Sequence, residues 1–327
     1  MKKNCKIGII GCGGIAGAHI KGYAENRDVE LIAFCDIKEE NAKRYAEKLG
    51  GRTYSNYKMI LEKEELDGIS VCTPPVNHKE ITEDVLSEGV NVFCEKPLAM
   101  NSREALSMAE TAQKNKRLLM TGFKFRFKDE VQNAKRLIEE GKIGKVVLAR
   151  NMFGGFAEMK ERFFSKKNIS GGGVLIDNGS HAIDLFRFLL GEVKNVSARI
   201  NTAIQKIEVE DTAKILMEME NGALVTIDLS WSVPIPSEHY LEIYGSEGTI
   251  TLPPLRYRRK DAQEWTKYEV QNENVFAKET AHFVNCILKK EKPIVDGLDG
   301  LRAQEVIDAA YKSCRENCRV EVKKAEI

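Results

Sequence analysis

The sequence predicts an α/β protein whose N-terminal part is a doubly wound parallel sheet and whose C-terminal part is an α+β domain with an open, mostly antiparallel sheet. Up to Gly122, short apolar strands alternate with helical segments, as in parallel sheets. After Gly122 the strands come mainly in adjacent pairs, and Asn221-Gly222 between two of them is a strong hairpin signal. At 327 residues the chain suits two domains, which we place at residues 1–122 and 123–327.

The composition is that of a globular protein with a small-molecule partner. Hydrophobic residues make up 43% and charged residues 30% of the chain, so we do not expect disorder. Fifty basic against forty-nine acidic residues leave a net charge of +1, which recommends neither nucleic acid nor an anionic membrane as partner. No apolar stretch approaches the ~20 residues of a membrane helix. We therefore expect a small-molecule ligand, no nucleic acid and no membrane.

The eight cysteines indicate a reducing compartment. Cys12, Cys35, Cys72 and Cys94 lie in or at the end of predicted buried strands, where cysteine acts as a small hydrophobic residue. Cys314 and Cys318 are four residues apart at a helix end, but no second pair or nearby histidine accompanies them, so we expect no metal. Reduced thiols indicate a cytoplasmic protein.

The first predicted strand, 6–10, runs into a glycine-rich turn that is followed by a helix over 17–23. The turn has the pattern G-x-G-x-x-G/A, in which glycines allow a tight turn and let the backbone approach a pyrophosphate at a helix N-terminus. This pattern predicts a Rossmann-type dinucleotide site, and the alternative is a tight turn without a ligand. The predicted cofactor residues of the turn are Gly11, Gly13, Gly14 and Ile15, with Ala16 completing the pattern.

The second predicted strand, 30–35, ends in Asp36. An acidic residue at this position accepts hydrogen bonds from both ribose hydroxyls of an adenosine and repels a 2′-phosphate. Asp36 therefore predicts NAD rather than NADP as cofactor. Lys38 could soften the repulsion, so the use of NADP stays open, and a helix N-cap for residues 38–49 is the alternative role of Asp36.

The alternation then continues to the end of the first domain. Further strands are expected at 67–72, up to Glu95, and at 117–121, and further helices at 38–49, 56–62, 78–87 and 102–114. Thr73 and Pro74 close one strand at the same edge of the sheet as the glycine turn, and His78 opens the next helix. We expect these three residues to border the nicotinamide.

The motif Glu95-Lys96-Pro97 ends a buried strand with a charged pair. The carboxyl edge of the strands is where open α/β sheets bind their ligands. The strand before Lys96 and the restricted proline after it can aim the ammonium group at one point. The alternative is a surface lysine beside a turn.

The second domain begins with a predicted helix over 129–140. Strands are expected at 145–153, 194–203, 212–220, 223–231, 240–244 and 249–252, and helices at 276–289 and 301–316. Such an open sheet needs a partner on one face. We expect a homodimer or homotetramer formed through this sheet.

A second chemical segment runs from Gly171 to Asp184 and opens a helix. Asp177 and His181 are one helical turn apart, so their side chains share a face. A carboxylate below an imidazole can orient it and raise its basicity, as a general base for an alcohol proton requires. A metal-binding pair and a buried histidine with a capping aspartate are the alternatives.

Together, Gly11-x-Gly13-x-x-Ala16, Asp36, Glu95-Lys96-Pro97 and the segment with Asp177, His181 and Asp184 resemble the glucose-fructose oxidoreductase, inositol dehydrogenase and MocA family. The resemblance spans nearly the whole chain. It implies that Lys96, Asp177 and His181 are catalytic and that Glu95 and Lys96 belong to the cofactor site. The substrate contacts that it implies are Lys96, Arg126, Asp177, His181 and Tyr240.

The resemblance implies an NAD-dependent oxidoreductase that acts on a secondary hydroxyl of a cyclic polyol, sugar or sugar derivative. His181 would take the hydroxyl proton while Lys96 stabilises the developing alkoxide. Two alternatives are a family member that uses NAD transiently without net redox, and a non-catalytic sensor of NAD(H). The loop 154–168 has a basic content that could suit a phosphorylated or carboxylated sugar, or it could simply be solvated. The substrate, the reacting carbon, the direction and the choice between dimer and tetramer stay open.

Overall fold

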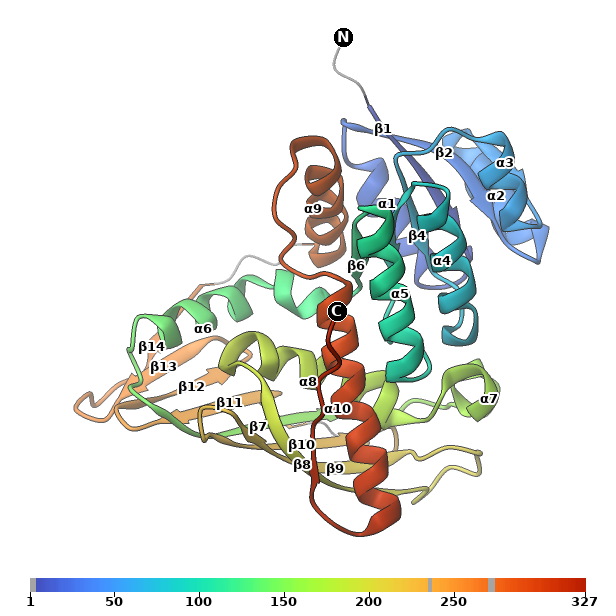
Figure 1. Ribbon diagram of the computed structural model, residues 1–327. Helices are drawn as coiled ribbons and strands as arrows, with labels where there is room; N and C mark the ends of the chain where they lie inside the picture. The colour runs from blue at the N-terminus through green and yellow to red at the C-terminus, as the bar shows by residue number, and fades with distance from the viewer. Residues whose placement is uncertain (1–3, 235–236, 270–273) are drawn as a thin grey trace. The chain divides into compact units, whose positions relative to one another are not determined.

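The computed structural model describes residues 4–234, 237–269 and 274–327, which belong to two compact units (Figure 1). The first unit contains the chain up to residue 124, the segment 274–301 and Ile327, and the second contains 125–273 and 302–326. Our division by sequence order placed 274–301 in the second domain. In the structure this segment returns to the first unit, because the helix that it contains packs there.

The first unit is built on a parallel sheet with the strand order β3-β2-β1-β4-β5-β6, counted over its described residues. The doubly wound α/β fold predicted from the sequence is therefore confirmed. Its strands are β1 (Cys5–Ile10), β2 (Val29–Cys35), β3 (Arg52–Tyr54), β4 (Gly68–Val71), β5 (Asn91–Cys94) and β6 (Leu119–Thr121). The short strand β3, which pairs with β2, was not predicted, since three residues carry little periodicity.

Helices cover the sheet of the first unit, and four of them pack in two pairs (Figure 1). They are α1 (Ala16–Ala24), α2 (Glu39–Leu49), α3 (Tyr57–Lys63), α4 (His78–Ser87), α5 (Ser102–Asn115) and α9 (Val275–Lys289). Helix α4 lies beside α5, and α1 lies beside α9. At Gly22 of α1 a Cβ atom would overlap the hydroxyl of Thr280, so the glycine allows α9 to approach closely.

The second unit holds, in its described part, a mixed sheet with the order β14-β13-β12-β11-β7-β10-β9-β8-β15. Its pairs are antiparallel except β7 with β10. The strands are β7 (Val146–Gly154), β8 (Val193–Asn201), β9 (Thr212–Met219), β10 (Leu224–Ser230), β11 (Leu241–Gly245), β12 (Gly248–Leu252), β13 (Arg256–Arg259), β14 (Thr266–Lys267) and β15 (Val320–Glu321). The hairpin predicted at Asn221-Gly222 joins β9 and β10, with Gly222 at φ 87°.

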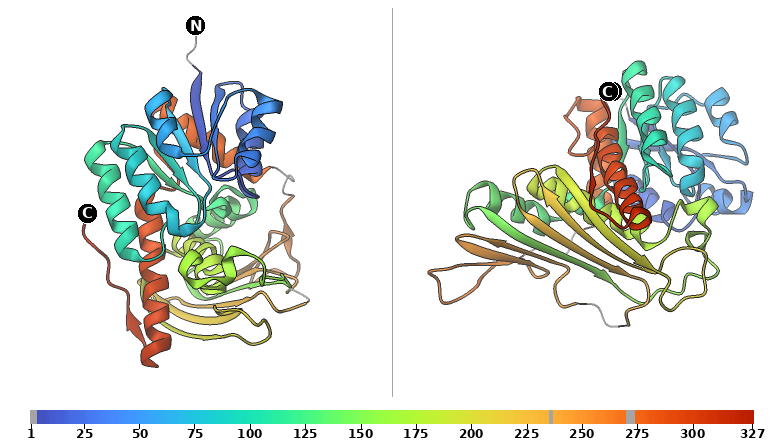
Figure 2. Two further views of the ribbon diagram at one scale, coloured as in Figure 1. Left: turned by 90° about the vertical axis from the view of Figure 1, so that its right-hand side faces the viewer. Right: turned by 60° about the horizontal axis from the view of Figure 1, so that its bottom comes forward.

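Helices α6 (Asp129–Glu139), α8 (Val174–Leu190) and α10 (Gly297–Glu316) lie on one side of this sheet, as the right-hand view of Figure 2 shows. Strand residues that face the helices, such as Ile215, Val225 and Ile227, are fully buried. Leu148, Leu216, Leu224 and Tyr244 are exposed apolar residues on the same sheet. Within the described ranges, no helix is both long enough and apolar enough to cross a membrane.

Candidate functional site

The glycine turn of the first unit has the geometry of a nucleotide-binding loop. Gly11 has φ +86°, and a Cβ atom there would lie 2.7 Å from the carbonyl carbon of Cys72, so only glycine fits. At Gly13 and Gly14, by contrast, there is room for a side chain, because a Cβ atom would meet nothing within 4 Å. The space next to these two residues leaves the backbone open to a ligand at the start of α1.

Asp36 follows β2 and is turned toward this loop. Its Oδ2 accepts a hydrogen bond from the backbone N–H of Cys12 at 2.8 Å, and its Oδ1 accepts one from the N–H of Lys38 at 2.8 Å. The N-cap of α2 is Lys38, so Asp36 is not the helix cap that we considered as an alternative. A half-buried carboxylate held against the glycine loop fits the ribose of NAD.

Arg44 on α2 is a further neighbour of the loop that sequence reasoning missed. Its Nη2 donates to the carbonyl of Cys12 at 2.8 Å, and its guanidinium lies 4.6 Å from the ring centre of Tyr45. Cys12 thus joins Asp36 and Arg44 in one cluster. The helical pattern of 39–49 did not reveal this contact, because it depends on how α2 folds back onto the loop.

Glu95 and Lys96 follow β5 at the carboxyl edge of the sheet. Lys96 is half-buried, whereas Glu95 is buried and its Oε2 accepts the backbone N–H of Lys96 at 3.1 Å. The Oε1 of Glu95 lies 2.8 Å from Nε2 of His19 on α1. Burial opposes the charge on Glu95, yet the hydrogen bond from His19 and the nearby charge of Lys96 hold the pKa of Glu95 below its ordinary value.

His78 binds the two loops at this edge together. Its Nε2 lies 2.8 Å from the carbonyl oxygen of Thr73, and its Nδ1 lies 2.9 Å from that of Pro97. Burial lowers the pKa of His78, whose side chain is 1% exposed and presents almost no surface to a ligand. The observed role of His78 is therefore to connect the loops that hold Thr73 and Pro97. The expected contacts of Thr73, Pro74 and His78 with the nicotinamide stay predictions.

In the second unit, α8 carries the segment with Asp177 and His181. The glycines before it allow a close approach by distant residues. A Cβ atom at Gly173 would overlap the carbonyl oxygen of Glu210, and one at Gly172 would overlap the hydroxyl of Tyr311. The Oε1 of Glu210 accepts the N–H of Gly173 at 3.0 Å, that of Leu175 at 3.1 Å and the hydroxyl of Tyr311 at 2.7 Å.

Glu210 thus places a carboxylate at the N-terminus of α8, where the helix dipole favours negative charge. The bond with Glu210 also fixes the first turn of the helix, which holds Asp177. Sequence reasoning missed Glu210 and Tyr311, since neither lies near the glycines in the chain. No local motif could have revealed them.

Asp177 and His181 project from α8 one turn apart, as predicted. Asp177 is half-buried and His181 is buried. The ring of His181 meets the ring of Phe125 edge-on, with 5.1 Å between their centres. This contact links the histidine to an aromatic cluster.

The aromatic cluster consists of Phe125, Phe153 and Tyr240. Their ring centres are 5.0 to 5.7 Å apart, and Tyr240 donates its hydroxyl hydrogen bond to Glu130 at 2.5 Å. The ammonium of Lys128 lies 4.8 Å from the ring centre of Phe125 and 4.9 Å from that of Tyr240. Burial and the carboxylate of Glu130 raise the pKa of Tyr240 well above its usual range. Tyr240 is therefore a neutral hydroxyl in the same cluster as His181.

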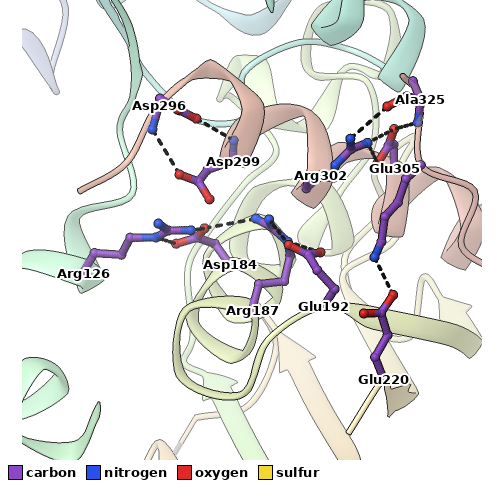
Figure 3. A network of polar contacts seen from close by, with 11 residues as sticks. Arg126, Asp184, Arg187, Glu192, Glu220, Asp296, Asp299, Arg302, Glu305 and Ala325 are labelled. Carbon is purple, nitrogen blue, oxygen red and sulfur yellow. Dashed lines mark hydrogen bonds and ion pairs between the residues drawn. The ribbon is translucent and has the colours of Figure 1, made fainter. Parts of the chain in front are cut away.

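Arg126 takes part in a buried ion-pair network (Figure 3). Its Nε and Nη2 donate to both carboxylate oxygens of Asp184, at 3.0 and 2.6 Å. Arg187 lies 3.7 Å from Asp184 and makes its own two-fold contact with Glu192. Because the guanidinium is held by Asp184 on α8 and Arg126 is only 5% exposed, its main visible role is to anchor this helix. The expected contact of Arg126 with a substrate stays a prediction.

Two family models match the chain. The model described as "Oxidoreductase family, NAD-binding Rossmann fold" matches residues 5–123, and the model described as "GFO/IDH/MocA C-terminal domain" matches residues 131–251. The first match includes the glycine loop, Asp36 and Lys96, and the second includes Asp177 and His181. Together they cover most of the chain.

The chain is also similar to known proteins over most of its length. D-glucoside 3-dehydrogenase of Escherichia coli (strain K12) is 29% identical over 349 residues, which cover 97% of this chain and 97% of that protein. Glucose-6-phosphate 3-dehydrogenase of Bacillus subtilis (strain 168) is 30% identical over 253 residues, 73% of this chain and 72% of that protein. The crystal structure of aldose-aldose oxidoreductase from Caulobacter crescentus, complexed with glycerol, matches with a TM-score of 0.89 at 26% identity and covers 98% of this chain and 100% of that chain. The chain therefore belongs to the GFO/IDH/MocA family of oxidoreductases, and NAD is its cofactor.

Proposed function

We propose that this protein is an NAD-dependent dehydrogenase that oxidises a secondary hydroxyl of a cyclic sugar, polyol or sugar derivative, or reduces the matching ketone. The observation that carries the proposal is the pair of Asp177 and His181 on one face of α8, capped by Glu210 and bordered by aromatic rings. The names of the two relatives, both sugar 3-dehydrogenases, support the substrate class. When bound, NAD supplies the acceptor for the hydride.

In this proposal His181 takes the proton of the reacting hydroxyl, and Asp177 orients the hydroxyl and the imidazole. Lys96 places its ammonium charge where negative charge develops on the substrate oxygen. The expected cofactor contacts are Gly11, Gly13, Gly14, Ile15, Asp36, Thr73, Pro74, His78, Glu95 and Lys96. Open space at Gly13 and Gly14 and the orientation of Asp36 support this assignment.

The surroundings of His181 fit a sugar ring. Phe125, Phe153 and Tyr240 offer partly exposed apolar surface beside the histidine, and such surface can pack against the C–H face of a ring and exclude water. Tyr240 and Lys128 add a hydroxyl and an ammonium group at the edge of this surface. We therefore propose that Tyr240 contacts the substrate. For Arg126, whose guanidinium binds Asp184 on α8, the proposed substrate contact rests on the family resemblance alone.

The test is a screen of sugars, sugar phosphates and polyols in which NADH absorbance is followed with the wild type, Lys96→Met and Lys58→Met. Lys58 is a half-exposed lysine of the same unit and serves as the matched control. We expect a hit whose turnover falls roughly 100- to 1000-fold in Lys96→Met only, since that is the usual effect of losing one transition-state donor. Near-normal turnover in Lys96→Met would contradict the proposed role of Lys96.

The same screen separates the alternatives. A sugar that is consumed without accumulation of NADH points to transient use of NAD with no net redox. NAD binding without any converted sugar points to a sensor. Neither alternative has a structural observation that favours it over the dehydrogenase.

We also propose that the protein is a homodimer or homotetramer formed through the open sheet. Leu148 of β7 lies in register with Leu224 of β10 on one side and with Tyr244 of β11 on the other, so an apolar row crosses three strands. Replacing Leu148 and Leu224 with Glu should lower the mass measured by light scattering, whereas Ile204→Glu, at an exposed residue outside the strands, should not. An unchanged mass in the double variant would exclude this surface.

The cytoplasm is the proposed location. Six of the eight cysteines are buried, and burial raises the pKa of the Cys12 and Cys35 thiols to about 12. Thiols of this kind serve as packing residues and suit a reducing compartment. Fractionation of the host cell with an antibody to the protein would test the location.

A further inference from the structure

A row of buried polar side chains runs through the first unit and ends at Glu95. Tyr23 Oη lies 2.8 Å from Ser70 Oγ, which lies 3.2 Å from Nδ1 of His19. Nε2 of His19 lies 2.8 Å from Oε1 of Glu95. Tyr23, Ser70 and His19 are fully buried, and the ring of His19 lies against Phe93 with 4.5 Å between the centres. Such a row is costly to bury unless each member is hydrogen-bonded.

The donor and acceptor groups of these four side chains determine the direction of the hydrogen bonds between them. The carboxylate of Glu95 only accepts, so Nε2 of His19 donates to it. Nδ1 of a neutral imidazole then accepts from the Ser70 hydroxyl, and Ser70 in turn accepts from the Tyr23 hydroxyl. With the proton of His19 on Nε2, every donor of the row points toward Glu95.

Glu95 connects the row to the backbone of Lys96. Its second oxygen, Oε2, accepts the backbone N–H of Lys96 at 3.1 Å. Gly122 packs directly against it, since a Cβ atom there would lie 3.2 Å from Cδ of Glu95. A carboxylate held by His19 on one oxygen and by the Lys96 backbone on the other has little freedom to turn.

We infer that His19 is a positioning residue for Lys96, acting through Glu95. The inference rests on the proposed function, because it is the reaction that requires Lys96 at one point. His19 holds the Glu95 carboxylate in its charged form and in one orientation, and Glu95 holds the backbone and the counter-charge of Lys96. Sequence reasoning had found no role for His19.

The titratable and charged groups that face Glu95 come from several elements. They are His19 of α1, Cys72 after β4, His78 of α4, and Cys94 and Lys96 beside it in the chain. Burial alone raises the pKa of a carboxyl group, and in Glu95 the bond from His19 is the foremost cause that reverses this. Without His19, Glu95 should take up a proton at a higher pH and lose its charge beside Lys96.

The experiment compares the wild type, His19→Leu, His19→Gln and the control His282→Gln, at a half-buried histidine of α9 in the same unit. For His19→Leu we expect kcat to fall about 10- to 100-fold, as for a displaced catalytic group, with little change in the Kd of NAD. The acidic limb of the pH profile of kcat should move to higher pH. Gln carries an N–H donor and should restore part of kcat and of the profile, whereas His282→Gln should change neither.

A second readout does not need turnover. Competitive labelling of lysine amines with acetic anhydride, followed by mass spectrometry, measures how the reactivity of Lys96 depends on pH relative to Lys58. We expect the Lys96 curve to shift in His19→Leu and to return toward the wild type in His19→Gln. Unchanged Lys96 labelling and an unchanged pH profile in folded His19→Leu would overturn the inference. A shifted labelling curve in a protein that converts no sugar would instead leave His19 in its role and overturn the proposed function.

Discussion

The glycine loop of the first unit and the glycine run before α8 in the second unit use the same residue for opposite reasons. At Gly13 and Gly14 an added Cβ would meet only open space, so the missing side chain keeps room for something outside the protein. At Gly172 and Gly173 an added Cβ would overlap Tyr311 or Glu210, so the missing side chain makes room for the protein itself. We therefore expect the first pair to serve ligand binding, whereas the second pair lets distant residues of the same unit approach the start of α8.

The candidate functional groups of the two units are held in different ways. In the first unit the functional groups follow strand ends, and the backbone carries them directly. In the second unit they are assembled from remote segments. Glu210 binds the start of α8, and Phe125, which contacts His181, packs against Phe153 and Tyr240. If these groups bind substrate as proposed, we expect substrate preference to change through side-chain exchanges in the second unit, while the glycine loop of the first unit keeps its backbone.

The largest effect is expected for Gly173→Ala. The added methyl group would overlap the backbone oxygen of Glu210 and lie 2.8 Å from its amide nitrogen, so no side-chain rotation relieves the contact. We expect a loss of roughly 4 kcal/mol or more in the free energy of unfolding, measured by urea denaturation. Gly172→Ala should cost less, because the group that it meets is the hydroxyl end of Tyr311. Equal stability of Gly173→Ala and the wild type would contradict the comparison.

Gly13→Ala should leave stability nearly unchanged and weaken the binding of NAD instead. We expect its free energy of unfolding to stay within about 0.5 kcal/mol of the wild type, as for a surface substitution without new contacts. Its Kd for NAD, measured by calorimetry, should rise about tenfold, which corresponds to the loss of ~1.4 kcal/mol of binding free energy. A variant that lost stability but bound NAD normally would show that the loop glycines are structural as well.

The choice of cofactor offers the next test. Asp36 should give the wild type a ten- to hundredfold lower Kd for NAD than for NADP, since charged hydrogen bonds are worth about 1.5 to 3 kcal/mol. Changing Asp36 to Ser together with Ile37→Arg should reverse the preference, and Ile37 is 90% exposed, so the arginine can reach a phosphate without disturbing the core. Fluorescence titration of both cofactors measures the effect, with Ile37→Gln as control. Equal affinities in the wild type would mean that Lys38 or Arg44 offsets Asp36.

The smallest effect is expected at Asp211, the neighbour of Glu210. Burial opposes its charge, but hydrogen bonds from the N–H groups of Gln205, Ala203 and Ile204 and from Ser232 lower the pKa of Asp211 from 3.8 to about 2. A carboxyl group with a lowered pKa stabilises the fold above about pH 4 and loses this contribution as the pH falls toward 2. The stability difference between the wild type and Asp211→Asn should therefore shrink between pH 5 and pH 2. A constant difference across this range would rule out the charge as the cause.

The sequence by itself determined the parallel sheet of the first unit, the second sheet with its hairpins, and the family. These features depend on interactions between neighbours in the chain, such as apolar periodicity and the glycine turn, so they can be read locally. The same holds for the spacing of Asp177 and His181, because one helical turn fixes it. The strand β3 escaped prediction because it is too short to show a period.

Only the tertiary structure decided which partners these residues have. His19 meets Glu95 from 76 positions away, Glu210 meets Leu175 from 35, and Arg126 meets Asp184 from 58. The return of α9 to the first unit is of the same kind, since it depends on the close approach that Gly22 allows. Contacts of this type join residues that are far apart in the chain, so no local sequence pattern encodes them.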